Sequence, residues 1–135
     1  MRIVVDTNVL VSGILSPHGP PATVLRLLLN EHVSLCFDER IMSEYRDVLT
    51  RGKFGFAPDL VEDVLSFLEV TGVPVVADPL SNNLPDPTDL MFLEVSHSGA
   101  AEFLVTGNLR HFPKSSRGDI VVLSPRNFVD HIGST

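Results

Sequence analysis

The stretch Arg2-Ile3-Val4-Val5-Asp6-Thr7-Asn8-Val9-Leu10-Val11 opens the chain and decides the expected fold. Its β-branched residues Ile3–Val5 are typical of a buried parallel strand, which ends abruptly at Asp6. Ligands of open α/β sheets bind beyond the carboxyl ends of the strands, which is where Asp6 would lie. One of the two polar residues after Asp6 is expected to cap a short apolar helix over Val9–Leu15. This stretch alone leaves two roles open for Asp6, a catalytic carboxylate or a simple helix cap.

Strand-like and helix-like stretches alternate along the whole chain. The strand-like runs are Ile3–Val5, Val33–Phe37, Val73–Ala77, Glu102–Val105 and Ile120–Leu123. The helix-like stretches are Val9–Leu15, Pro20–Glu31, Glu39–Leu49, Pro58–Val70, Asp86–Gly99 and Pro125–Ile132. Such alternation is typical of a parallel sheet covered by helices on both faces. We therefore expect an α/β fold with a central parallel sheet of about five strands, in one domain over residues 1–135.

The composition narrows the class of protein. The chain has 135 residues, of which 44% are hydrophobic and 20% charged, as in globular proteins. It contains no apolar run long enough to cross a bilayer and no signal-peptide pattern, and its single Cys36 suits a reducing compartment, so we expect a cytoplasmic protein. The net charge of −7 argues against a protein that holds nucleic acid by bulk positive charge. It does not exclude a nuclease, because clustered carboxylates that bind divalent cations also make a protein acidic.

Acidic and amide side chains follow the predicted strands, as Asp6 does. Glu44 lies in the helix after the second strand, Asp86 and Asp89 open the helix after the third, and Asn108 follows the fourth. The carboxyl ends of parallel strands meet at one edge of the sheet, so we expect these side chains to lie near Asp6.

Each of these acids also has a structural interpretation. Glu44 borders the apolar stripe of its predicted helix, where a purely solubilising glutamate is less common, and the alternative is an ion pair with Arg40 one turn earlier. Asp86-Pro87-Thr88-Asp89 is nearly an ideal helix opening, with an N-cap acid, a proline at the first position and an acid at the third. Helix capping could explain both aspartates, and capping is compatible with metal binding.

A cluster of carboxylates suits a hard divalent cation. Two to four carboxylates can hold one or two Mg²⁺ or Mn²⁺ ions by oxygen alone. A bound ion lowers the pKa of its water and neutralises charge that develops on a phosphodiester. The sequence shows no His or Cys pair with zinc-like spacing, no nucleophile elbow and no phosphate-binding glycine-rich loop. These residues therefore favour metal-dependent phosphodiester hydrolysis.

Five stretches together carry a family resemblance. They are Val4–Ser12, Glu44-Tyr45 with Val48-Leu49, Asp86-Pro87-Thr88-Asp89 with Phe92-Leu93, Leu104–Asn108, and Leu123-Ser124-Pro125. In this order and at this spacing the chain resembles PIN-domain proteins, specifically the toxin components of bacterial and archaeal toxin–antitoxin systems. The resemblance implies a three-layer α/β/α sandwich, Mg²⁺- or Mn²⁺-dependent cleavage of RNA, a homodimer and an antitoxin partner.

The family's acidic site maps onto Asp6, Glu44 and Asp89 of this chain. Asn108 stands where the family usually has a fourth acid. Its side-chain oxygen can ligate a hard cation but brings no charge, so we expect weaker metal binding. We expect three further residues to support these ligands: Asn8, Asp86 and Thr106.

Basic residues after the Asn108 turn are candidates for RNA contact. Arg110, His111 and Lys114 would form a rim that contacts phosphates. The alternative is that they are ordinary solvated loop charges.

Two other functions remain open from the sequence. Because Asn108 brings no charge to the fourth acidic position, the first is a PIN domain with weakened catalysis that acts as an RNA- or protein-binding module. The other is a phosphatase of the haloacid-dehalogenase type with Asp6 as nucleophile, although Asn8 stands where that family has a second aspartate.

Overall fold

Five parallel strands form the central sheet of the computed structural model, which describes residues 1–133. The strands are β1 (Arg2–Val5), β2 (Ser34–Phe37), β3 (Val73–Pro74), β4 (Phe103–Val105) and β5 (Val122–Leu123). Their order across the sheet is β3-β2-β1-β4-β5, and every pair is parallel. The predicted α/β fold with about five parallel strands is confirmed. The last two residues of the predicted domain lie outside the described range.

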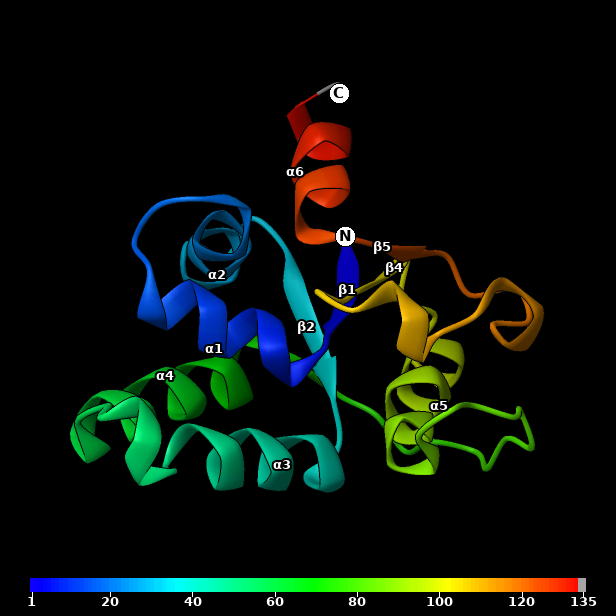
Figure 1. Cartoon of the computed structure of the whole chain (residues 1–135), viewed down its shortest axis with the longest axis horizontal. Coiled ribbons are helices and arrows are strands. Elements are labelled where there is room, and N and C mark those ends of the chain that lie inside the picture. The colour runs from blue at the N-terminus through cyan, green and yellow to red at the C-terminus, as the bar shows by residue number, and fades with distance from the viewer. Residues whose placement is uncertain (134–135) are drawn as a thin grey trace.

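Helices cover both faces of this sheet. They are α1 (Thr7–Leu15), α2 (Pro20–Leu29), α3 (Glu39–Leu49), α4 (Pro58–Thr71), α5 (Leu90–Ser98) and α6 (Pro125–Gly133). In Figure 1, α1, α2 and α4 lie to one side of the central strands and α5 lies to the other. The predicted three-layer α/β/α sandwich is thus confirmed. None of the helices within residues 1–133 has the length and apolar character needed to span a membrane.

The central strand β1 is the most deeply buried part of the sheet. The side chains of Ile3, Val4 and Val5 have no exposed surface. A parallel strand packed on both faces needs a continuous apolar run, because side chains on either face meet a helix layer. Each such side chain contributes about 1.5–3 kcal/mol on burial. β1 therefore provides a rigid base for the residues that follow it.

The edge strands are shorter than predicted. The strand expected over Val73–Ala77 pairs only at Val73–Pro74, after which the Val75 N–H still donates to the Phe37 carbonyl at 2.8 Å. Pro74 has no N–H and the strand has one neighbour, so the ladder ends early and Val76 is 96% exposed. At the other edge, Ile120–Leu123 is likewise reduced to β5.

Two helix starts differ from the predictions. α1 begins at Thr7 rather than Val9, and Asp6 precedes it without any side-chain capping bond. Simple capping therefore does not account for Asp6. The helix expected over Asp86–Gly99 begins as a 3-10 turn at Pro87–Asp89, followed by α5. Here Asp86 does cap, because its carboxylate accepts a bond from the Thr88 N–H at 3.0 Å.

The strand order changes direction at β1. The chain moves from β1 to β2 and β3 on one side, and then returns to β4 and β5 on the other. Ligands of such sheets bind in the crevice outside the carboxyl ends of the strands at this switch point. Asp6 follows β1 and the Thr106–Asn108 turn follows β4, so both stand at the switch point.

Candidate active site

Asp6 is a buried carboxylate at the tip of β1, with 5% of its surface exposed. Its Oδ2 accepts hydrogen bonds from Thr106 Oγ1 at 2.8 Å and from Asn8 Nδ2 at 3.3 Å. Burial raises the pKa of Asp6 above its usual range, while the hydrogen bond from Thr106 acts against this rise. The two predicted supporting residues Asn8 and Thr106 therefore both hold Asp6 in this structure.

The turn after β4 is bonded to the start of α1. The Gly107 N–H donates to Asn8 Oδ1 at 3.0 Å, and the Asn108 N–H donates to Thr106 Oγ1 at 3.0 Å. A Cβ atom at Gly107 would lie 3.1 Å from the same Asn8 oxygen, which explains a glycine at this close approach. Asn108 is half-buried beside the fully buried Thr106.

Glu44 faces the same region from α3. It is half-buried, and its carboxylate accepts a hydrogen bond from the buried Thr7 hydroxyl. The alternative ion pair between Glu44 and Arg40 was wrong, because Arg40 pairs with Asp38 and Glu94 instead. Sequence reasoning missed the role of Thr7, since the contact joins positions far apart in the chain.

Asp89 is the second buried carboxylate of the site, with 8% of its surface exposed. Its Oδ2 has no hydrogen-bond partner, although His111 Nδ1 lies 3.1 Å away and forms an ion pair when protonated. Burial, followed by the charge of Asp6, raises the pKa of Asp89 to about 6, and Asp86 and Glu44 add to the rise. Asp89 thus lies within the electric field of the other predicted acids.

Asp86 differs from Asp89 in its surroundings. It is exposed, and hydrogen bonds from the Thr88 hydroxyl and N–H lower its pKa below the usual range. These contacts make Asp86 a helix cap, and its predicted support of the ligands stays a prediction.

The donors in this region suit a hard divalent cation. They are carboxylate and amide oxygens, the Asp89 Oδ2 is buried without a hydrogen bond, and neighbouring negative charges raise the pKa of Asp89. Within residues 1–133, however, no three His, Cys, Asp or Glu side chains stand close enough to hold a metal ion together. The site therefore has suitable donors but not a preformed coordination shell.

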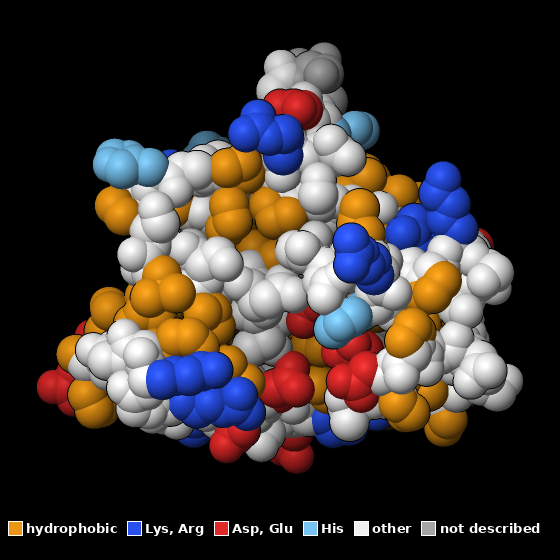
Figure 2. Space-filling model, in the orientation of Figure 1, with side chains coloured by type: hydrophobic (Ala, Val, Ile, Leu, Met, Phe, Trp, Pro, Cys, Tyr) orange, Lys and Arg blue, Asp and Glu red, His pale blue; other side chains and the backbone are white. Residues whose placement is uncertain are grey.

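The predicted basic rim divides into two kinds of residue. Arg110 and Lys114 are exposed in the 3-10 turns Leu109–His111 and Lys114–Ser116. His111 is half-buried against Asp89 and so belongs to the acidic centre itself. Figure 2 shows acidic side chains gathered between α3 and the start of α5, with histidine and basic side chains beside them.

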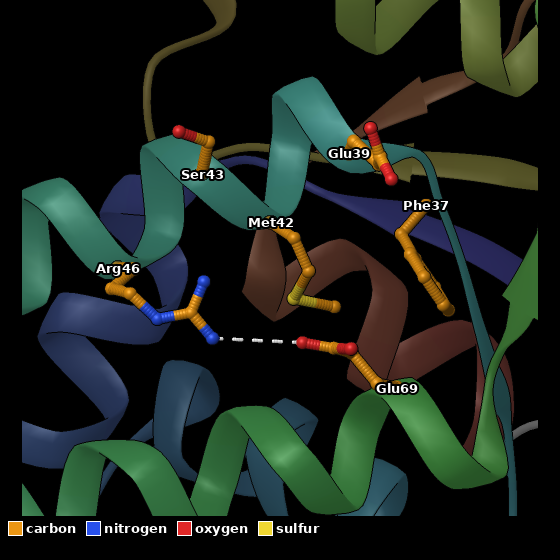
Figure 3. A pocket seen from close by; sticks show the side chains of 6 residues that line it. All are labelled: Phe37, Glu39, Met42, Ser43, Arg46 and Glu69. Atoms are coloured by element: carbon orange, nitrogen blue, oxygen red, sulfur yellow. Dashed lines mark ion pairs between the residues drawn. The ribbon is translucent and has the colours of Figure 1, made fainter.

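A hollow of about 290 Å³ lies outside the acidic centre. It is lined by Phe37, Glu39, Met42, Ser43, Arg46 and Glu69, none of which is a predicted site residue (Figure 3). Arg46 and Glu69 form an ion pair of 3.6 Å across it. The predicted site residues therefore lie apart from this hollow.

Solved structures share this fold. VapBC2 from Rickettsia felis, bound to a DNA fragment from its promoter, matches with a TM-score of 0.61 and 15% identity over 92% of this chain and 98% of that chain. FitAcB from Neisseria gonorrhoeae matches with a TM-score of 0.58 and 18% identity over 92% of this chain and 98% of that one. At these identities the likeness shows the fold alone. A comparison with curated proteins found no match.

A family model for the PIN domain matches residues 2–110, which include every predicted acidic position of the site. The match confirms the resemblance inferred from the sequence motifs, and we set aside the haloacid-dehalogenase alternative. The chain belongs to the PIN-domain family.

Proposed function

We propose that this protein is a divalent-metal-dependent endoribonuclease and the toxin of a toxin–antitoxin pair. One observation carries the proposal: two buried carboxylates, Asp6 and Asp89, stand at the switch point of the sheet, and the charge of Asp6 helps to raise the pKa of Asp89. Repulsion between two buried carboxylates destabilises the native fold unless a bound cation or substrate compensates for it. Family membership supports the same reading, because PIN domains are generally nucleases.

In this proposal the oxygens of four residues would hold Mg²⁺ or Mn²⁺: Asp6, Glu44, Asp89 and Asn108. A bound cation would lower the pKa of its water and neutralise charge on the scissile phosphodiester. Thr106 and Asn8 orient Asp6, and Thr7 orients Glu44, through the hydrogen bonds described above. These bonds limit the movement of both carboxylates before any ligand binds.

RNA contact is assigned to side chains beside the acids. Arg110 and Lys114 are exposed and would contact phosphates on either side of the cleaved bond. Since His111 lies 3.1 Å from Asp89 Oδ2, it would contact the substrate nearest the reacting phosphate. The nuclease would act on cellular RNA in the cytoplasm.

The partners are proposed from the neighbours. VapBC2 was solved bound to a DNA fragment from its promoter, and its fold matches 92% of this chain. Together with the resemblance to the toxin components of toxin–antitoxin systems, this leads us to propose an antitoxin protein as partner and a homodimer as the active assembly.

Cleavage of labelled single-stranded RNA in Mn²⁺ tests the proposal. We expect wild type to cut, EDTA to stop cleavage, and Asp89→Asn to reduce the rate by at least about 100-fold, because a ligand worth several kcal/mol is lost. Asp119→Asn is the matched control, since Asp119 is exposed and lies before β5, at the opposite end of the sheet. Cleavage by Asp89→Asn at the wild-type rate would refute the assignment.

A second function has a specific observation in its favour. Asn108 brings no charge, and the described residues contain no preformed metal shell. Both facts suit a binding module that has lost catalysis. In that case Mn²⁺ would leave the melting temperature of the protein unchanged, whereas RNA or the antitoxin would raise it.

A further inference from the structure

We propose that Arg40 and Glu94 are positioning residues, which fix the separation between the helix that carries Glu44 and the helix that follows Asp89, two of the proposed metal ligands. The inference rests on the proposed metal-dependent function. It concerns a buried carboxylate, Glu94, that has no role in the chemistry proposed above.

Glu94 is 6% exposed and lies in α5. Its Oε1 accepts a bond from Arg40 Nη1 at 2.7 Å, and its Oε2 accepts one from the Leu80 N–H at 2.8 Å. Burying a carboxylate costs several kcal/mol unless its oxygens are paired in this way. Glu94 therefore depends on both partners, and it joins α5 to α3 and to the segment that leads to Asp86.

Arg40 is itself fixed to the start of α3. Its Nε and Nη2 lie 2.9 and 2.8 Å from Asp38 Oδ2, while Asp38 Oδ1 caps the helix by accepting from the Ile41 N–H at 3.0 Å. A guanidinium is planar, so using one edge for Asp38 directs the remaining nitrogen toward Glu94. Because Arg40 is fixed to the N-cap of α3, its contact with Glu94 holds the start of the helix and not only a mobile side chain.

The positions of these residues connect them to the proposed ligands. Arg40 lies one helical turn before Glu44 in α3, on the same face. Glu94 lies little more than one turn after Asp89, which precedes α5. In the part of the chain that the structure describes, no other ion pair joins α3 to α5. A change in this bridge would therefore alter the separation of Glu44 and Asp89.

Arg46 offers a matched control on the same helix. Its side chain is 44% exposed, against 50% for Arg40, and it also pairs with two carboxylates. Those partners, Glu62 and Glu69, lie on α4, as Figure 3 shows for Glu69. Arg46→Gln thus removes an arginine with two carboxylate partners from α3 without touching the contact with α5, and its partners differ from Glu94 in being about half exposed.

The first experiment needs no metal. Hydrogen exchange is compared for wild type, Arg40→Gln and Arg46→Gln in EDTA, after each variant is shown to melt cooperatively. We expect peptides containing Leu80 and the first turn of α5 to exchange at least about tenfold faster in Arg40→Gln alone. Equal exchange of these peptides in the Arg40 and Arg46 variants would overturn the proposal.

The second experiment measures free Mn²⁺ by electron paramagnetic resonance during titration. Arg40→Gln should weaken Mn²⁺ binding by about tenfold or more, as loss of outer-shell support does elsewhere. Arg46→Gln should stay within about twofold of wild type, and Arg40→Lys should recover part of the loss. Wild-type affinity in Arg40→Gln would overturn the proposal. If wild type itself bound no Mn²⁺, the proposed function would fail, and hydrogen exchange alone would decide whether Arg40 holds the helices.

Discussion

The hydroxyl of Tyr45 donates a hydrogen bond to the carbonyl oxygen of Val5, so α3 is fastened to the carboxyl end of β1. Tyr45 is fully buried. The residue before it is Glu44, and the residue after Val5 is Asp6. This contact between side chain and backbone therefore joins the two segments that carry these proposed ligands, as the bond from Thr7 to Glu44 also does.

Tyr45→Phe tests that contact. The phenyl ring keeps the packing, so the loss is one hydrogen bond, about 1 kcal/mol of unfolding free energy. We expect a lower urea midpoint with an unchanged slope, and RNA cleavage reduced by about tenfold because Glu44 is less well placed. Unchanged cleavage despite the loss in stability would show that the bond serves the fold alone.

Thr106→Val removes the hydroxyl that holds Asp6. The variant keeps the buried shape, but Asp6 Oδ2 and the Asn108 N–H both lose a partner. We expect a loss of about 1–3 kcal/mol in stability and about 10–100-fold in Mn²⁺ affinity, measured by denaturation and by calorimetry. Thr106→Ser keeps the hydroxyl and should stay close to wild type in Mn²⁺ affinity. Equal affinities for the valine and serine variants would contradict the role of the hydroxyl.

Asp89 should make stability depend on pH. Its pKa is raised from 3.8 to about 6 in the folded protein, so between these values the folded state binds more protons than the unfolded state. Stability without metal should therefore fall as pH rises through this window. Asp89 makes no side-chain capping bond, so Asp89→Asn removes the charge without removing a cap. We expect it to raise the melting temperature by a few degrees near neutral pH and by much less near pH about 4.

The pH experiment has a matched control. Asp119→Asn makes the same chemical change at an exposed side chain, so its melting temperature should follow that of wild type across the range. A neutral-pH stabilisation that persisted unchanged in acid for Asp89→Asn would contradict the raised pKa.

Asn108→Asp supplies the acid that the family usually carries at this position. An added carboxylate beside Thr106 should tighten Mn²⁺ binding by about tenfold, and it should lower the stability of the metal-free protein through repulsion. Thermal melts with and without MnCl₂ measure both effects. Asn127→Asp adds the same charge in the first turn of α6, away from the site, and should leave the Mn²⁺ response unchanged. No gain in Mn²⁺ response for Asn108→Asp would place the fourth ligand elsewhere.

Much of the fold could be predicted because its signals are local. α3 spans Glu39–Leu49 as expected, since Asp38 is an N-cap that bonds the Ile41 N–H at 3.0 Å. Pro58 likewise opens α4 as expected. The ends of the strands were harder to predict, because the length of an edge strand such as β3 depends on how far it continues to pair with its single neighbour.

The site was predictable in its location but not in its contacts. Alternating strands and helices imply that residues after β1 and β4 meet at one edge, and Asp6 and Thr106 do. The alternative that paired Arg40 with Glu44 one turn away was wrong, because the buried Glu94 binds the same guanidinium. The contact between His111 and Asp89 was not predicted. The sequence showed only that His111 lies in a short turn after Asn108, which does not indicate which acid it meets.

The sequence by itself determined the parallel α/β architecture, the helix caps at Asp38 and Asp86 and the edge of the sheet where acids collect, because periodicity, proline positions and capping residues act over one or two turns of chain. The expected cap of α1 at Thr7 or Asn8 was wrong, since Asp6 occupies that position. The tertiary structure alone decided that Thr7 holds Glu44, that Arg40 joins α3 to α5, and that Asp89 is buried while Asp86 is exposed. These outcomes depend on how helices distant in the chain pack on the sheet. Burial then sets which charges need a partner and which carboxylate has its pKa raised.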